Sequence, residues 1–213
     1  MTLESDSDAV GGPGAGSQYR TLYRYTKALS VALGYRDRYT RLHSDRVLAL
    51  SQQIGIRAGL SERELGVLRI GASFHDIGKI GIPDHVLLKP TQLDQTEADE
   101  MKKHSELGEN IILSTEIHGA EDVARVIRRH HENFDGMGYP DGLAGESIPV
   151  CSRIIGIADS YDAMALTRSY HLARSHREIV EIMSGESGRK HDRDLLRLFL
   201  EIIEESDYRA VEP

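Results

Sequence analysis

The chain has 213 residues, a formal net charge of −8 at pH 7 and one cysteine. This length suits one domain with a sizeable core, and the acidic balance gives no reason to expect a nucleic-acid polymer as a partner. One cysteine excludes an intramolecular disulfide and a thiolate metal cluster. With no apolar run near the ~20 residues that span a membrane and no signal-peptide layout, we expect a cytoplasmic protein without a membrane partner.

The beginning of the chain differs in composition from the rest. Residues 1–17 are rich in glycine and poor in apolar groups, which predicts a disordered lead before a single domain over residues 18–213. From Tyr19 onward, apolar residues recur at helical spacing. A first clear helical face is predicted to end near Gly59, and it consists of His43, Val47, Leu50 and Ile54.

Helix start signals continue along the chain. The capping boxes Ser61–Glu64 and Ser175–Glu178 predict two helix N-termini, and Asp192 is expected to cap a last helix. No run shows a convincing strand alternation, so we predict an all-α helical bundle. The expected loops cover residues 78–96, 133–148 and 184–191.

Histidines and aspartates recur at intervals of about one helix plus its connection. Each lies on an apolar face or at its end, where an isolated polar group would be costly to bury. The joint pattern predicts a metal site in the bundle core, because each helix brings one or two ligands to the same level. The candidate metal ligands are His43, His75, Asp76, His104, His130, His131 and Asp159.

Adjacent pairs of candidate ligands favour two metals over one. His75-Asp76 and His130-His131 each point to different sides of the backbone, so each pair can straddle two ions. Mixed imidazole and carboxylate ligands favour Fe, Mn, Zn or Ni over Ca or Mg. Asp76 is the natural bridge, because a carboxylate offers two oxygens. Two metals ~3.5–4 Å apart can hold a bridging hydroxide as nucleophile and clamp phosphoryl oxygens.

Polar residues near these ligands suggest supporting roles. Lys79 could reach a metal-bound phosphate as a point charge, and Arg168 could bind phosphate oxygens through its forked guanidinium. Glu132 and Asp162 are expected to hydrogen-bond to ligand imidazoles. A cluster of arginines before the histidine pair could add positive field near a substrate mouth, namely Arg125, Arg128 and Arg129.

The order of these motifs resembles a known family. From about Tyr35 to Phe199 the chain is similar to the HD-GYP domain, a subgroup of the HD phosphohydrolases. The resemblance is carried by His75-Asp76-Ile77-Gly78-Lys79, by His130-His131-Glu132 with Asp135-Gly136 and Gly138-Tyr139-Pro140, and by Ala158-Asp159 with Tyr161-Asp162-Ala163.

The resemblance implies an HD-type bundle and a phosphodiesterase that linearises cyclic di-GMP and often cuts it further to GMP, commonly with iron or manganese. It implies metal binding by the same seven residues, with Asp76 and Lys79 as catalytic residues. Substrate phosphate would contact Lys79 and Arg168. Tyr139 would contact substrate, or a partner such as a diguanylate cyclase or another signalling protein.

Three departures from the family pattern bear on the site. Tyr39 stands where some members have a glutamate that helps hold a third metal, so we expect two metals. After Arg168, Ser169 replaces the usual proline, and His171 replaces a basic residue at the substrate phosphate, which predicts weaker binding there. The usual Phe-Asp-Pro near the C-terminus reads His191-Asp192-Arg193.

Two other functions stay open. The chain could be an HD hydrolase for another cyclic dinucleotide or nucleotide, since a changed residue such as His171 would reshape the pocket. It could also be a non-hydrolytic receptor for cyclic dinucleotides that acts on a partner through the loop around Tyr139. Retention of all seven candidate ligands argues against the receptor, because a pure binder has no evident need for them.

Overall fold

The computed structural model describes residues 15–36, 38–166 and 173–210, and these residues form helices and loops without any strand. The predicted all-α class is therefore confirmed. The α-helices are α1 (Ala15–Arg36), α2 (Arg38–Arg57), α3 (Glu62–Phe74), α4 (Asp84–Leu87), α5 (Gln95–Lys102), α6 (His104–Leu113), α7 (Ala120–Arg128), α8 (Val150–Ala165), α9 (His176–Gly185) and α10 (Arg193–Glu204); the 3-10 helices are η1 (Ile77–Gly81) and η2 (Gly145–Ser147).

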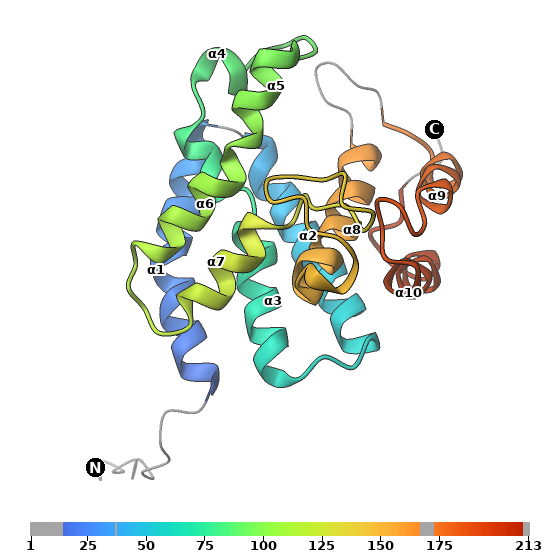
Figure 1. Ribbon diagram of the computed structural model, residues 1–213, viewed down its shortest axis with the longest axis horizontal. Helices are drawn as coiled ribbons and strands as arrows, with labels where there is room; N and C mark the ends of the chain where they lie inside the picture. The colour runs from blue at the N-terminus through green and yellow to red at the C-terminus, as the bar shows by residue number, and fades with distance from the viewer. Residues whose placement is uncertain (1–14, 37, 167–172, 211–213) are drawn as a thin grey trace, which may run out of the picture.

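Helix α3 lies at the centre of the bundle, where it contacts α1, α2, α7 and α8 (Figure 1). Helices α4 and α5 lie together at one end, and α9 and α10 lie beside α8 and α2. Aliphatic side chains without solvent exposure fill the space between the central helices, and they include Leu50, Ile54, Leu68, Ile127 and Ile155. Burial of these chains drives the helices together around one core.

The local signals in the sequence mark the helix ends correctly. Ser61 and Ser175 both form capping boxes, and the Asp192 carboxylate accepts backbone N–H groups at the start of α10. The apolar face of α2 is buried as predicted. Helix α2 ends at Arg57, and Gly59 follows with a φ of 75°, a left-handed conformation that favours glycine.

The expected loop at 78–96 is wrong in part, because it contains η1, α4 and the start of α5. Helix α4 has four residues, too few to show an apolar period. Arg36 at the end of α1 stabilises this stretch, since its guanidinium donates to the carbonyls of Ile80 and Ile82 and pairs with Asp84 at 2.6 Å.

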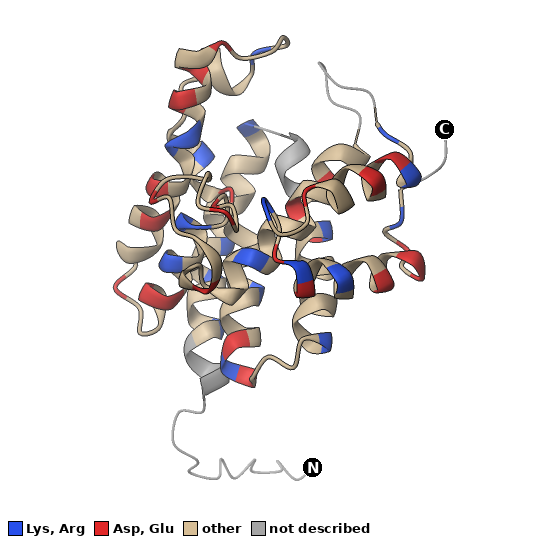
Figure 2. Ribbon diagram, turned by 45° about the vertical axis from the view of Figure 1, so that its right-hand side comes forward, with Lys and Arg blue, Asp and Glu red and all other residues tan. Residues whose placement is uncertain are grey.

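Two sequence expectations concern the surface and the ends of the chain. The predicted lead falls mainly on residues 1–14, which lie outside the described residues, and α1 begins at Ala15. None of the helices in the described part is long and apolar enough to cross a membrane. Basic and acidic residues are interspersed over the helices (Figure 2).

Candidate metal centre

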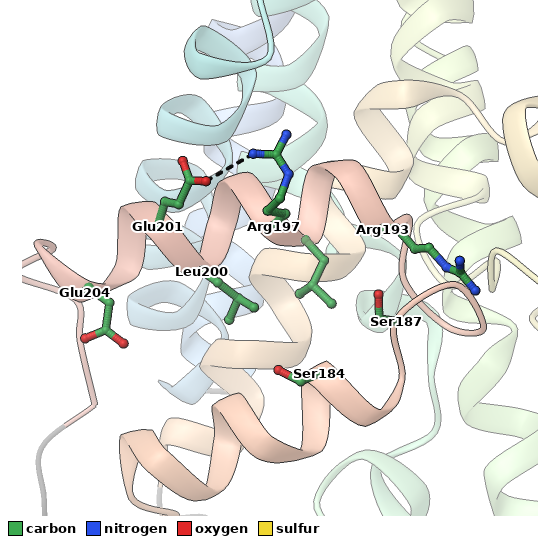
Figure 3. Close-up of a pocket in the computed structure, with 8 residues that line it drawn as sticks. Ser184, Ser187, Arg193, Arg197, Leu200, Glu201 and Glu204 are labelled. Carbon is green, nitrogen blue, oxygen red and sulfur yellow. Dashed lines mark hydrogen bonds and ion pairs between the residues drawn. The ribbon is translucent and has the colours of Figure 1, made fainter.

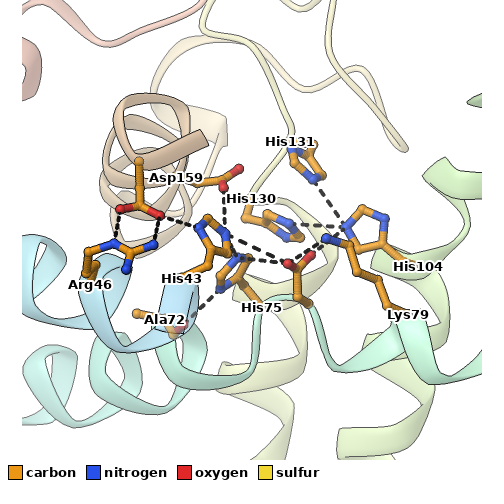
Figure 4. A network of polar contacts seen from close by, with 11 residues as sticks. His43, Arg46, Ala72, His75, Lys79, His104, His130, His131 and Asp159 are labelled. Carbon is orange, nitrogen blue, oxygen red and sulfur yellow. Dashed lines mark hydrogen bonds and ion pairs between the residues drawn. The ribbon is translucent and has the colours of Figure 1, made fainter. Parts of the chain in front are cut away.

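The seven candidate ligands come from five segments of the bundle and meet in its core (Figure 4). His43 and Asp159 lie inside helices, on α2 and α8. The others lie at helix ends: His75 follows α3, His104 begins α6, and the remaining three are Asp76, His130 and His131. His43, His75, Asp76, His104 and His130 are buried, while His131 and Asp159 are partly exposed.

The ring nitrogens face one another in two groups that share Asp76. In the carboxylate-rich half (His43, His75, Asp76 and Asp159), His43 Nε2 lies 3.3 Å from His75 Nε2 and 3.1 Å from Asp159 Oδ1. In the imidazole-rich half (Asp76, His104, His130 and His131), His104 Nε2 lies 3.4 Å from His130 Nε2 and 3.2 Å from His131 Nε2. Each half contains three groups whose ligand atoms lie close enough to hold one ion.

Asp76 connects the two halves through different oxygens. Its Oδ2 lies 3.5 Å from His75 Nε2 and 3.9 Å from His43 Nε2, and its Oδ1 lies 3.6 Å from His104 Nε2. The turn that carries Asp76 packs tightly on α6, because a Cβ at Gly78 would overlap the carbonyl oxygen of His104. Glycine at this position therefore lets Asp76 approach the imidazole-rich half.

Three of the histidines are oriented in the same way by the main chain. His75, His104 and His130 each place Nδ1 against the carbonyl three residues earlier, at 2.9, 2.8 and 2.6 Å. A carbonyl oxygen only accepts hydrogen bonds, so Nδ1 carries a proton and Nε2 is the nitrogen that faces the centre.

This tautomer makes the cluster suited to cations. Burial lowers the pKa of His104, and it holds the pKa of His130 well below its usual range, so both rings are neutral. Their Nε2 atoms then face each other with lone pairs and cannot hydrogen-bond. A metal ion removes this repulsion, because both lone pairs can bind to it. The donor set therefore fits metal ions of the imidazole-binding type.

His43 is oriented by a charged pair instead of the main chain. Asp162 Oδ2 accepts from His43 Nδ1 at 2.6 Å, and Arg46 Nε donates to Asp162 Oδ1 at 2.5 Å. Burial lowers the pKa of His43, but the carboxylates of Asp159 and Asp162 outweigh burial and raise it to about 9. Arg46 has no role in the sequence prediction, although its position three residues after His43 places both on neighbouring faces of α2.

The carboxylates at the centre stay ionised. Burial disfavours the charged form of Asp76, but the ammonium of Lys79 and the surrounding imidazoles hold its pKa well below the usual range. Lys79 Nζ donates to Asp76 Oδ2 at 2.7 Å. The pKa of Asp159 is likewise held low despite burial, because His43 hydrogen-bonds to it. Negative charge is thus available to cations at both halves.

The loop after His131 is held by a carboxylate and two arginines. Glu132 accepts from the backbone N–H groups of Asp141 and Leu143, so the expectation that it binds an imidazole is wrong. Arg128 pairs with Asp141 and Glu109, and Arg129 pairs with Asp141. These two arginines therefore brace the loop, and acidic partners neutralise the positive field expected from them.

Tyr139 forms one wall of the imidazole-rich half. Its ring stacks on the His131 ring with centroids 4.9 Å apart. Lys102, on α5, places its Nζ 5.8 Å from the centre of the Tyr139 ring. The Tyr139–Pro140 peptide bond is cis. A Cβ at Gly138 would overlap the Asn133 backbone, so this tight turn requires glycine. Tyr139 is thereby held beside the cluster, while the predicted substrate contacts Arg168 and His171 lie outside the described residues, as does Ser169.

Two cavities differ in what lines them. One of about 270 Å³ borders His130, His131 and the loop with Tyr139. Another of about 490 Å³ lies between α9 and α10 and is lined by serine, leucine, arginine and glutamate side chains, with the ion pair of Arg197 and Glu201 on its rim (Figure 3). The first cavity, next to the histidine cluster, is therefore the one connected to the candidate chemistry.

The protein is an all-helical bundle whose core brings imidazoles and carboxylates together. It is therefore a helical domain with a candidate two-metal centre. The sequence profile of the HD domain family matches residues 27–195. The chain therefore belongs to the HD domain family, and the resemblance drawn from its motifs is confirmed.

Curated relatives share about a third of their aligned residues with the chain. The cyclic di-GMP phosphodiesterase response regulator RpfG of Xanthomonas campestris pv. campestris is 37% identical over 164 residues, 77% of this chain and 43% of the relative. A cyclic di-GMP phosphodiesterase of Thermotoga maritima is 35% identical over 184 residues, 86% of this chain and 50% of the relative. The 3'3'-cGAMP-specific phosphodiesterase 2 of Vibrio cholerae is 35% identical over 173 residues, 81% of this chain and 33% of the relative. The chain thus spans half or less of each.

Solved structures share the fold. An HDG"Y"P protein from Bdellovibrio bacteriovorus has a TM-score of 0.64 at 20% identity, covering 89% of this chain and 61% of the other. The HD domain of the Listeria monocytogenes phosphodiesterase PgpH in complex with cyclic-di-AMP has a TM-score of 0.57 at 17% identity, covering 81% of this chain and 92% of the other. At these identities the likeness shows the HD fold alone.

Proposed function

We propose that the chain is a metal-dependent phosphodiesterase that hydrolyses cyclic di-GMP to the linear dinucleotide, to GMP, or to both. The observation that carries this proposal is the full set of inward-facing ligand atoms arranged in two halves around Asp76. Curated relatives named as cyclic di-GMP phosphodiesterases, at 37% and 35% identity, support it.

Two divalent transition metals fit this donor set. The carboxylate-rich half would hold one and the imidazole-rich half the other, with Asp76 shared between them. Fe or Mn is our first choice, and the ligands also suit Zn or Ni. Bound metals would supply Lewis-acid stabilisation of the phosphoryl oxygens and activation of water. Tyr39 in place of a further acidic ligand supports two metals instead of three.

The chain's own residues orient the reaction. Asp76 and Lys79 are the proposed catalytic residues: Asp76 holds the two halves together, and Lys79 places a positive charge at their edge, 2.7 Å from Asp76 Oδ2. Substrate phosphate that approaches the centre would attract the Lys79 ammonium. Tyr139 would contact the substrate beside His131, and Arg168 and His171 complete the proposed substrate contacts.

A second candidate function keeps the chemistry and changes the substrate. Relatives named 3'3'-cGAMP-specific phosphodiesterases are as similar to the chain as some named for cyclic di-GMP, at 35% identity each. A hydrolase for a mixed-purine cyclic dinucleotide is therefore the main alternative. A diguanylate cyclase or another signalling protein that docks on the loop around Tyr139 is a further proposal, and it rests on family resemblance.

The deciding experiment is a chromatographic assay of purified protein with cyclic di-GMP, 3'3'-cGAMP and cyclic di-AMP, under anaerobic Fe(II) and under Mn(II). We expect metal-dependent formation of the linear dinucleotide or GMP. Preference for 3'3'-cGAMP would favour the alternative substrate. Tight binding of cyclic di-GMP without turnover under either metal would contradict the enzyme and favour a receptor.

A further inference from the structure

The cavity of about 270 Å³ beside the histidine cluster has polar side chains that the metal centre does not use. It lies under the loop that carries Tyr139, and its other walls are α8 and the connection between α9 and α10. His130 and His131 form the wall on the side of the metal centre. A group in this cavity would therefore be adjacent to a phosphate bound at the imidazole-rich half.

Five polar side chains that line the cavity have no hydrogen-bond partner among the described residues: Asn133, Tyr139, Ser160, Lys190 and His191. Those that lie outside the histidine cluster and carry N–H or O–H donors include the amide of Asn133, the hydroxyl of Ser160 and the ammonium of Lys190, which forms an ion pair with Glu186 Oε2 at 3.7 Å, beyond hydrogen-bond distance. By contrast, Arg153 Nη1 donates to Asp192 Oδ2 at 2.5 Å. The cavity thus offers polar groups for a ligand from the loop, from α8 and from Lys190.

The charges around the cavity balance. Arg153 and Lys190 each contribute a positive charge, and Glu132 and Asp192 each contribute a negative one. His191 adds no charge, because burial lowers its pKa to about 3. Its Nε2 lies 3.3 Å from Glu186 Oε2 but does not form a hydrogen bond with it. A site with balanced charge does not select a phosphate, which needs a net positive field.

Apolar side chains also line the cavity. Phe134 and Met137 contribute from the loop that carries Asn133, while Arg153 and Ser160 contribute from α8. A flat ring with apolar faces and a hydrogen-bonding edge matches a lining that offers both apolar and polar side chains. Nucleobases have this shape, whereas a free phosphate or a carboxylate does not.

We propose that this cavity is a nucleobase subsite that prefers guanine, with Lys190 donating to the base edge and Asn133 and Ser160 supplying further hydrogen bonds. Guanine presents two acceptors, O6 and N7, on the edge where adenine presents one acceptor and an amino donor. A lysine ammonium only donates, so it accepts guanine and disfavours the adenine amino group. The inference rests on the proposed function, since it places a nucleotide phosphate at the metal centre.

The test is the affinity of the Mn-loaded protein for GMP and for AMP, measured by calorimetry. We expect wild-type protein to bind GMP about tenfold more tightly than AMP, the effect of one charge-assisted hydrogen bond. Lys190→Ala should remove most of this preference, and Lys190→Gln should remove it as well, because a glutamine amide both donates and accepts and can bind the adenine edge. Lys190 is exposed, so neither variant should disturb folding.

Arg189→Ala is the matched control. Arg189 is an exposed cation on the same connection, and its guanidinium donates to the Gly185 carbonyl at 2.9 Å without lining the cavity. It should keep the wild-type preference. Equal affinity for GMP and AMP in the wild type, or the same preference in Lys190→Ala, would overturn the guanine subsite.

Binding and turnover separate this inference from the proposed function. A GMP preference that depends on Lys190, without hydrolysis of any cyclic dinucleotide, would retain the base subsite and reject the enzyme. Hydrolysis of cyclic di-GMP with no GMP preference would retain the enzyme and reject the subsite. Where both hold, Lys190→Ala should lower the ratio of kcat/KM for cyclic di-GMP over cyclic di-AMP by about tenfold.

Discussion

The two halves of the metal centre bring similar numbers of ligands together by different means. In the imidazole-rich half, main-chain carbonyls orient His104 and His130, and burial keeps the rings neutral. In the carboxylate-rich half, the ionised Asp162 orients His43, and the nearby carboxylates raise its pKa to about 9. The imidazole-rich half is thus oriented by main-chain carbonyls, whereas the carboxylate-rich half combines a carbonyl at His75 with charge at His43.

This difference predicts how each half responds to mutation. A carbonyl that orients an imidazole belongs to the main chain and cannot be removed by substitution, whereas Asp162 can. Charge on the partner also makes the ligating nitrogen of His43 more basic, which strengthens metal binding. The carboxylate-rich half should therefore be the one that can be weakened without removing a ligand.

The largest effect should come from Asp76, which both halves share. Asp76→Ala removes a ligand from each half and leaves the Lys79 ammonium without its carboxylate. We expect bound metal to fall in both halves and hydrolysis to drop by about a thousandfold or more. Elemental analysis and the chromatographic assay measure the two effects. Full activity in Asp76→Ala would contradict the two-half arrangement.

Removal of one ligand from each half compares them directly. His43→Ala and His104→Ala should each lower the bound metal from two equivalents per chain to about one, because the other half keeps its own ligands. Elemental analysis of protein purified without added metal measures this ratio. Loss of both metals from either variant would show that the halves do not bind independently.

Asp162 and Glu132 are both buried carboxylates, but Asp162 orients a histidine and Glu132 holds the loop. Asp162→Asn keeps the size of the side chain but removes the charge that faces His43 Nδ1, so metal affinity should fall about 10–100-fold. Competition with a chromophoric chelator measures this affinity. The matched control is Glu132→Gln, since Glu132 is also buried but accepts from backbone N–H groups of the loop. An equal loss in both variants would contradict a special role for Asp162.

The sequence predicts those features of the site that depend on local signals, and it misses those that depend on long-range contacts. Spacing and motifs pointed to the seven candidate ligands, and the structure brings all of them together. The caps at Ser61, Ser175 and Asp192 were predictable because capping depends on residues three positions apart or fewer. Signals of this kind are local, and they need no knowledge of tertiary packing.

The partners of those ligands were harder to predict. Asp162 and Glu132 are both acids next to candidate ligands, yet only Asp162 binds an imidazole. The choice depends on Arg128 and Asp141, which fold the loop back so that its N–H groups reach Glu132. Such contacts are long-range or depend on loop conformation, and residue type alone does not specify them.

The pH dependence of stability in the metal-free protein best distinguishes the two halves. The folded-state pKa of His43 is about 9 against an unfolded value of 6.5, so its contribution is full below pH 6.5 and is lost as pH rises through 9. A gap of about 2.5 pKa units corresponds to about 3 kcal/mol. His104, His130 and His131 have lowered pKa values, so they make stability rise with pH up to about 6.5.

Denaturant midpoints measured in chelator from pH 5 to 9.5 should therefore rise to about pH 6.5 and then fall. His43→Gln should abolish the fall above pH 6.5 while keeping the rise below it, and His131→Gln should reduce the rise while keeping the fall. A midpoint that stays level between pH 7 and 9 in the wild type would mean that the carboxylates around His43 do not hold a proton there. The charge-based account of the carboxylate-rich half would then be wrong, whereas the backbone-based account of the other half would stand.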